Sequence, residues 1–247
     1  MSFLINKENQ KIVYKRIIGK KPGIIFIHGL NSDMTGNKAI NIEKYAKQKK
    51  LSFIRFDCRG HGKSFGKIED FTISDWKDDL LNIIDKIAEG PQILVGSSMG
   101  GWLMMIASQL RNSRIIGLVG LAAAPDFTSD LFEKLPKKNQ IQIKEKGITK
   151  LKKWGFNYIF KKKFFIDGKK NFVKNKKFKF RKPIILIHGS KDDVVSETVP
   201  QNFLKKTSGT NIQLRILKNS NHRLSTLKDL KNIKNALDYM INNYKFN

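Results

Sequence analysis

Short apolar runs recur along the chain and predict buried strands. Each run is rich in Ile, Leu, Val and Phe, and is continuous rather than alternating, which is typical of parallel strands covered on both faces. The predicted strands are IVYKRII (12–18), GIIFIH (23–28), SFIRFD (52–57), QILVG (92–96), IIGLVGLAA (115–123), PIILIH (183–188) and IQLRIL (212–217). Together they predict a mostly parallel sheet.

Helical patterns lie between these runs. In 74–88, Trp76, Leu80 and Ile83 repeat at helix spacing, and Ser74 is placed to cap the N-terminus. Further helices are predicted at 38–49, 99–110 and 226–244. Strands that alternate with helices favour an α/β architecture with helices on both faces of the sheet.

The stretch 126–182 breaks this alternation. Glycines interrupt it and lysine runs dominate it. We interpret about 126–180 as an insertion between two core strands of a single domain covering 1–247, not as an independent domain.

Length and composition narrow the class of protein. The chain has 247 residues, of which 40% are hydrophobic, which fits one large α/β domain. It begins MSFLINKENQK, which is not the pattern of a secretory signal, and no run approaches the ~18 apolar residues of a membrane span. A single cysteine, Cys58, excludes an intrachain disulfide. These features predict a cytoplasmic protein.

The net charge of +27 raises the question of an anionic partner. Residues 126–182 hold 19 Lys and Arg against 5 Asp and Glu. Lysine is nevertheless abundant in every segment, which favours a lysine-rich composition without a dedicated partner. Weak contact with an anionic membrane surface stays an alternative, whereas nucleic-acid binding is disfavoured because 161–182 lacks a periodic aromatic platform.

The segment LVGSSMGGW (94–102) carries a candidate nucleophile. It fits G-x-S-x-G in one frame, which places Ser98 at the centre, because Ser97 would need glycines where Val95 and Met99 stand. This pattern requires small residues where a strand turns sharply into a helix, and it leaves the central hydroxyl exposed at the carboxyl end of the sheet. An apolar strand before it and an apolar helix after it strengthen the prediction.

A serine nucleophile of this type needs a histidine base. In the α/β-hydrolase arrangement the acid and the histidine follow the serine, in that order along the chain. His28 and His61 precede Ser98, and His188 closes a strand, where its expected role is turn structure. His222, in the polar segment NSNHRLS, comes late enough and is the predicted base.

The acid and the oxyanion donors are predicted from the same order of elements. The loop after the strand at 183–188 offers Asp192 and Asp193, and we favour Asp192 because its position suits a bend from the strand end towards His222. The backbone N–H of Met99 is one predicted oxyanion donor, and the N–H of Leu30 is the other.

Six motifs together resemble a branch of the α/β-hydrolase enzymes. They are IHGLNSDMTG, RFDCRGHGKSFG, LVGSSMGGW, AAAPDFT, IHGSKDDVV and NHRLS, and the match runs from about residue 20 to about residue 230. The branch contains bacterial serine hydrolases and a mitochondrial acyl-protein thioesterase and acyl-glucuronide esterase. The mitochondrial member carries a targeting peptide that this sequence does not show, so the resemblance favours a bacterial source. The resemblance implies an α/β-hydrolase fold in which Ser98 is the nucleophile, Asp192 the acid and His222 the base. It also implies that the insertion forms a lid over the acyl pocket.

The expected reaction is hydrolysis of a carboxylic ester or thioester through an acyl-enzyme, with no metal or cofactor. An acyltransferase or a peptidase on the same triad stays an alternative, as does a basic surface-binding protein without catalysis. Several aromatic and aliphatic residues of the insertion are expected either to line an acyl pocket or to pack it onto the core: Trp154, Phe156, Tyr158, Ile159, Phe160, Phe164 and Phe165.

Overall fold

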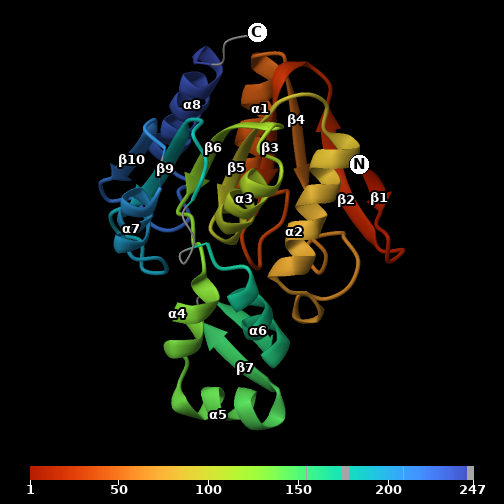
Figure 1. Cartoon of the computed structure of the whole chain (residues 1–247), viewed down its shortest axis with the longest axis vertical. Coiled ribbons are helices and arrows are strands. Elements are labelled where there is room, and N and C mark those ends of the chain that lie inside the picture. The colour runs from red at the N-terminus through yellow and green to blue at the C-terminus, as the bar shows by residue number, and fades with distance from the viewer. Residues whose placement is uncertain (154, 174–177, 208, 244–247) are drawn as a thin grey trace.

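A central sheet organises the protein. The computed structural model describes residues 1–153, 155–173, 178–207 and 209–243, and within these residues eight strands form the sheet (Figure 1). The strands are β1 (Ser2–Ile5), β2 (Lys11–Ile17), β3 (Lys20–Ile27), β4 (Leu51–Phe56), β5 (Gln92–Ser97), β6 (Ile115–Leu121), β9 (Ile184–Gly189) and β10 (Ile212–Leu217). Their spatial order is β1-β2-β4-β3-β5-β6-β9-β10. All pairs from β4 to β10 are parallel, which confirms the predicted mostly parallel sheet.

Helices cover both faces of this sheet. They are α1 (Asn37–Gln48), α2 (Ile73–Asn82), α3 (Met99–Leu110), α7 (Thr198–Lys206) and α8 (Leu227–Asn242). Successive residues of a strand point to opposite faces, so Ile24 packs with the apolar residues of α1 and α8, whereas Ile25 packs with those of α2 and α3. The continuous apolar runs of the sequence are therefore explained by burial on two sides.

The start of α2 differs from its prediction. The helix begins at Ile73, and Thr72 forms a capping box with Asp75, whose carboxylate accepts the Thr72 N–H at 2.8 Å. Ser74 lies inside the first turn, where its N–H donates to Asp167 of the insertion at 2.8 Å, so the predicted Ser74 cap was wrong. Thr72 caps the helix instead of Ser74 because it has the extended backbone of an N-cap residue and because Asp75 follows three positions later.

The insertion, which we call the lid (residues 126–182), follows β6 and precedes β9. It contains α4 (Phe127–Glu133), α5 (Lys137–Lys146), β7 (Ile148–Lys153), β8 (Phe156–Lys161) and α6 (Lys162–Lys170). In Figure 1 it projects from one end of the sheet. Phe160, Phe164 and Phe165 join the same apolar cluster as Trp76 and Trp102, so the lid packs onto the core of the main fold. No helix among the described residues is long and apolar enough to cross a membrane.

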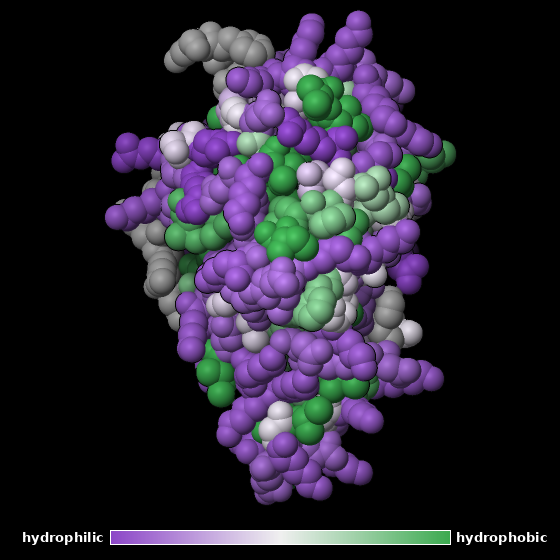
Figure 2. All heavy atoms as spheres, turned by 90° about the vertical axis from the view of Figure 1, so that its right-hand side faces the viewer, coloured by the Kyte–Doolittle hydropathy of each residue, from purple (hydrophilic) through white to green (hydrophobic). Residues whose placement is uncertain are grey.

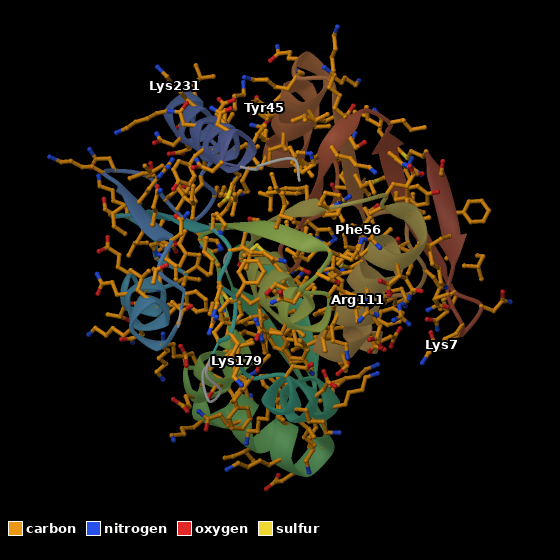
Figure 3. The ribbon with its side chains drawn as sticks, turned by 45° about the horizontal axis from the view of Figure 1, so that its top comes forward. Lys7, Tyr45, Phe56, Arg111, Lys179 and Lys231 are labelled. Atoms are coloured by element: carbon orange, nitrogen blue, oxygen red, sulfur yellow. The ribbon has the colours of Figure 1, made fainter. Side chains whose placement is uncertain are left out.

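Polar contacts tie α1 to its neighbours. Tyr45 of α1 reaches towards α8, where its hydroxyl donates to Asp238 at 2.8 Å (Figure 3). On the same helix, Glu43 is buried and accepts hydrogen bonds from Arg55 of β4 and Lys15 of β2, each at 2.7 Å. Burial raises the pKa of the Glu43 carboxyl, but its hydrogen bonds to lysine and arginine outweigh this and lower it to about 2.

We expect Glu43→Gln to destabilise the protein near neutral pH, because buried Arg55 would lose its carboxylate partner. A fall in the carboxyl pKa from 4.5 to about 2 corresponds to roughly 3 kcal/mol of stability. This contribution is fully present above the unfolded-state pKa and is lost as the pH falls towards the folded-state pKa. Urea unfolding of both proteins near neutrality and at about pH 3 measures the effect. A free-energy difference that is the same at both pH values would contradict it.

Candidate active site

Ser98 occupies a strained turn between β5 and α3. Its φ of 51° and ψ of −116° lie in a region that residues with side chains rarely adopt. Two glycines make the turn possible. A Cβ on Gly96 would lie 2.3 Å from the carbonyl oxygen of Gly100, and a Cβ on Gly100 would lie 2.3 Å from that of Ile27. The spacing of G-x-S-x-G therefore reflects direct backbone crowding at this turn.

The structure brings the side chains of Ser98, His222 and Asp192 into one hydrogen-bonded chain. Nε2 of His222 lies 3.1 Å from Oγ of Ser98, and Nδ1 lies 2.8 Å and 3.1 Å from the carboxylate oxygens of Asp192. Because a carboxylate only accepts, Nδ1 carries the hydrogen, and the lone pair of Nε2 faces the serine hydroxyl. An imidazole in this orientation can remove the hydroxyl proton and so activate Oγ as a nucleophile.

Asp192 is the acid that contacts His222, and its surroundings favour the ionised form. Its carboxylate is fully buried, which by itself raises the pKa. The hydrogen bond from His222 and those from the backbone N–H groups of Val195 and Val194, at 2.8 Å and 2.9 Å, outweigh burial and hold the pKa below its usual 3.8. Asp193 is exposed on the rim of the cleft instead.

The two predicted oxyanion donors border the same cleft as Ser98. Gly29, which precedes Leu30, lies so close that a Cβ on it would be 3.2 Å from the Ser98 Cβ. Met99 is the first residue of α3, so its N–H belongs to the positively polarised end of that helix. Neither the Leu30 N–H nor the Met99 N–H donates a hydrogen bond within the described part of the chain, so both can donate to an oxygen atom of a ligand.

A buried histidine, whose role the sequence did not specify, holds the Leu30 loop in place. Nδ1 of His28 donates to the carbonyl oxygen of Gly29 at 2.8 Å, and Nε2 accepts the backbone N–H of Cys58 at 3.0 Å. Burial lowers the pKa of His28, which keeps the ring in the neutral form that these two bonds require. The sequence feature that could have indicated this role is the pair His28-Gly29 at the end of a predicted strand.

Beside Ser98 lies a cleft of about 1310 Å³ between the sheet edge and the lid. A second cavity of about 300 Å³, which we call the side chamber, lies between β8 and the segment that precedes α2. Four residues border both spaces: Leu30, Asn31, Tyr158 and Phe160. At this boundary Asn31, which follows Leu30 in its loop, and Tyr158 of the lid border the same two spaces.

The lid residues expected near an acyl pocket lie in different places. Tyr158 and Phe160 border both spaces, and Ile159 and Phe164 line the side chamber. Phe165 is buried in the main apolar cluster. Trp154 lies outside the described residues, and the Phe156 side chain is not described either.

Cys58 and His61 lie near the site, but both are buried and neither is placed to react with a substrate. Cys58 is fully buried, and burial together with the neighbouring Asp79 and Asp57 raises the pKa of its thiol well above the usual value. Burial likewise lowers the pKa of His61 to about 3, and its ring packs between His28 and Trp76. Within the described residues, no group of three or more His, Cys, Asp and Glu side chains is placed to hold a metal ion.

The chain is similar to known proteins over nearly its whole length. Residues 22–147 match the family model described as the alpha/beta hydrolase fold. The cow protein named palmitoyl-protein thioesterase ABHD10, mitochondrial, is 36% identical over 98% of this chain and 80% of its own length. The human protein of the same name is 35% identical, with the same coverage.

Two solved structures show the same similarity in three dimensions. The mouse alpha/beta hydrolase domain-containing protein 10 has a TM-score of 0.91 and 35% sequence identity, and the match covers 98% of each chain. A structure from Agrobacterium vitis S4 has a TM-score of 0.91 and 30% identity, over 98% of this chain and 97% of that one.

Proposed function

The chain belongs to the α/β-hydrolase family and is a hydrolase of esters or thioesters, and from this premise we propose that Ser98, His222 and Asp192 are its catalytic triad. The observation that carries the proposal is the unbroken hydrogen-bonded chain from Ser98 Oγ through His222 to Asp192. The backbone N–H groups of Leu30 and Met99 are the proposed oxyanion hole.

The reaction proceeds through an acyl-enzyme. Nε2 of His222 takes the Ser98 proton while Oγ attacks the carbonyl carbon, and the negative charge on the carbonyl oxygen is stabilised by the Leu30 and Met99 N–H groups. Asp192 stabilises the imidazolium that forms. The alcohol or thiol leaves with a proton from His222. A water molecule activated by His222 then attacks the ester on Ser98 and releases the carboxylic acid.

We propose long-chain acyl thioesters, including acyl groups on protein cysteines, as the substrate class. The cow and human relatives are named for palmitoyl-protein thioesterase activity, and the cleft beside Ser98 is large. On the lid side the cleft is lined by the apolar side chains of Phe127, Leu131, Tyr158 and Phe160, together with the charged residues Asp130 and Lys134. The four apolar side chains can pack against an acyl chain.

Replacing Ser98 by Ala should lower the hydrolysis of all ester and thioester substrates by at least about 10⁴-fold, because the nucleophile is lost. The measurement is kcat/KM on p-nitrophenyl esters and acyl thioesters of graded chain length. A fluorophosphonate probe should label the original protein and not the variant. A Ser98→Ala protein that hydrolyses these substrates at the original rate contradicts the proposed nucleophile.

The side chamber is the proposed site for the far end of a long acyl chain. Four aromatic residues line it, namely Phe71, Trp76, Phe160 and Phe164, together with the charged residues Lys67, Glu69 and Lys161. It adjoins the cleft at Leu30, so a chain whose carbonyl oxygen is held by the Leu30 N–H can extend past Asn31 and Tyr158 into it. Each methylene buried there contributes about 0.8 kcal/mol of binding energy.

We expect Ile68→Trp, which fills the side chamber, to lower kcat/KM for a palmitoyl thioester about tenfold, since two fewer methylenes could be buried. Hydrolysis of a butyryl thioester should not change, because a short chain does not reach the chamber. Ile18→Trp is the matched control, since Ile18 is exposed just after β2 and borders neither the cleft nor the side chamber. Equal losses for both chain lengths would exclude the chamber as an acyl site.

The lid also offers a surface for anionic lipid, which would bring acyl substrates close to the cleft. Hydrophilic residues cover most of the face in Figure 2, and apolar patches lie between them, including near the lid at the bottom. Exposed Ile141, Ile148 and Ile166 lie among the lysines of α5, β7 and α6. Of the lid lysines that the structure describes, only Lys161 forms an ion pair with a carboxylate, that of Asp70.

At low salt the protein should co-sediment with vesicles that contain phosphatidylserine, and it should not co-sediment with neutral phosphatidylcholine vesicles. Each lysine near an anionic surface contributes about 1 kcal/mol, and salt screens this attraction. The double variant Lys150→Glu and Lys152→Glu should weaken binding at least about tenfold. The control is Lys7→Glu with Lys231→Glu, at positions that lie away from the lid (Figure 3). Equal binding to both vesicle types, independent of salt, excludes this surface.

A further inference from the structure

A second histidine approaches the carboxylate of Asp192. Nε2 of His188, at the end of β9, lies 3.5 Å from Oδ2 of Asp192, the oxygen that also accepts the shorter hydrogen bond from His222. The other carboxylate oxygen accepts the Val194 and Val195 N–H groups. The side chains of both His188 and Asp192 are almost completely buried.

The protonation of the His188 ring follows from its contacts. Nε2 lies 2.9 Å from the carbonyl oxygen of Val195, and because a carbonyl oxygen only accepts, Nε2 must carry a hydrogen. Nδ1 is buried and has no hydrogen-bond partner among the described residues. The ring therefore makes one hydrogen bond and points its N–H towards Val195 and the Asp192 carboxylate.

This bond closes the loop that carries the acid. Inside the loop, the Asp192 N–H donates to the Gly189 carbonyl oxygen at 3.1 Å. Val195 donates its own N–H to Asp192 and accepts the His188 N–H with its carbonyl oxygen. Val195 orients the Asp192 carboxylate through its N–H, and His188 holds Val195 in place through its carbonyl oxygen.

Packing alone does not account for a histidine at this position. A buried polar atom without a partner costs free energy, and an apolar side chain of similar size would fill the space without that cost. What an apolar side chain cannot supply is the N–H that bonds Val195 and faces the carboxylate.

We infer that His188 is a positioning residue for the catalytic acid. Its hydrogen bond holds Val195 in place, and its N–H helps to keep the Asp192 carboxylate in the orientation that accepts the hydrogen bond from His222. The inference rests on the proposed triad of Ser98, His222 and Asp192, and it adds a fourth side chain that acts through Asp192 without touching the substrate.

The test compares two replacements of similar size. Gln at position 188 can place an amide N–H close to where Nε2 stands, whereas Met fills the space and offers no donor. We expect His188→Met to lower kcat by about 10-fold to 100-fold with little change in KM, because a shift of the acid disturbs the alignment of His222 with Ser98. His188→Gln should keep kcat within about threefold of the original.

Two further measurements separate positioning from a general loss of structure. Titration with a fluorophosphonate counts the reactive Ser98 sites, so kcat is expressed per competent molecule. The proton on His222 Nδ1 should give a downfield NMR signal in the original protein and in His188→Gln, and this signal should move upfield or disappear in His188→Met. A purely structural role would change the number of reactive sites and leave their kcat unchanged.

The outcomes distinguish this inference from the proposed function. If Ser98→Ala is inactive while His188→Met retains the original kcat and NMR signal, the triad stands and the role of His188 is wrong. Equal losses in His188→Gln and His188→Met also overturn it, since the donor would then not matter. If Ser98→Ala is fully active, the proposed function itself fails.

Discussion

The candidate site depends on the backbone turn at Ser98. A strand that continued in an extended conformation would bury the hydroxyl within the sheet, and a relaxed loop would not fix its direction. The positive φ of Ser98 prevents both, and it is held because Gly96 packs against the backbone of Gly100 and Gly100 against that of Ile27. The same close approach brings β3 next to the start of α3. The Leu30 N–H and the Met99 N–H consequently border one cleft, and the parallel sheet directs the loops after β9 and β10 to the same edge.

Much of this arrangement could be read from the sequence, for physical reasons that differ from element to element. The central strands are buried on both faces, so their apolar runs are continuous and conspicuous, and the glycine spacing around Ser98 records a steric requirement. The edge strand β1 gave no comparable signal because only Leu4 of its four residues is buried. The predicted cap at Ser74 was wrong because a capping box depends on two residues together, here Thr72 and Asp75. The β-hairpin of the lid was obscured by lysines, which carry little strand preference.

The lid has a lysine-rich outer surface and an aromatic inner side, which composition alone could not distinguish. Lysines lie on widely separated parts of the molecule, as Lys7 and Lys231 do in Figure 3, so net charge does not single out one face. In the lid, however, Phe160, Phe164 and Phe165 are turned inwards onto the core, while exposed isoleucines lie among the lysines. In the proposed function, the inner face shapes the acyl space while the outer face contacts an anionic surface. A single segment would then couple the location of the protein to its choice of substrate.

The four histidines show how burial assigns roles within one residue type. His28, His61 and His188 are almost fully buried, whereas the His222 side chain is 20% exposed. A base must exchange protons with substrate and water, which requires access to the cleft, and His222 has that access. Two of the buried rings hold loops through hydrogen bonds: His28 holds the loop of the proposed oxyanion donor Leu30, and His188 holds the loop of the proposed acid Asp192. Each bonds a backbone carbonyl group, so each fixes the main chain, from which the reacting groups project. A strained serine turn can stay aligned with groups on three other loops only if those loops are similarly constrained.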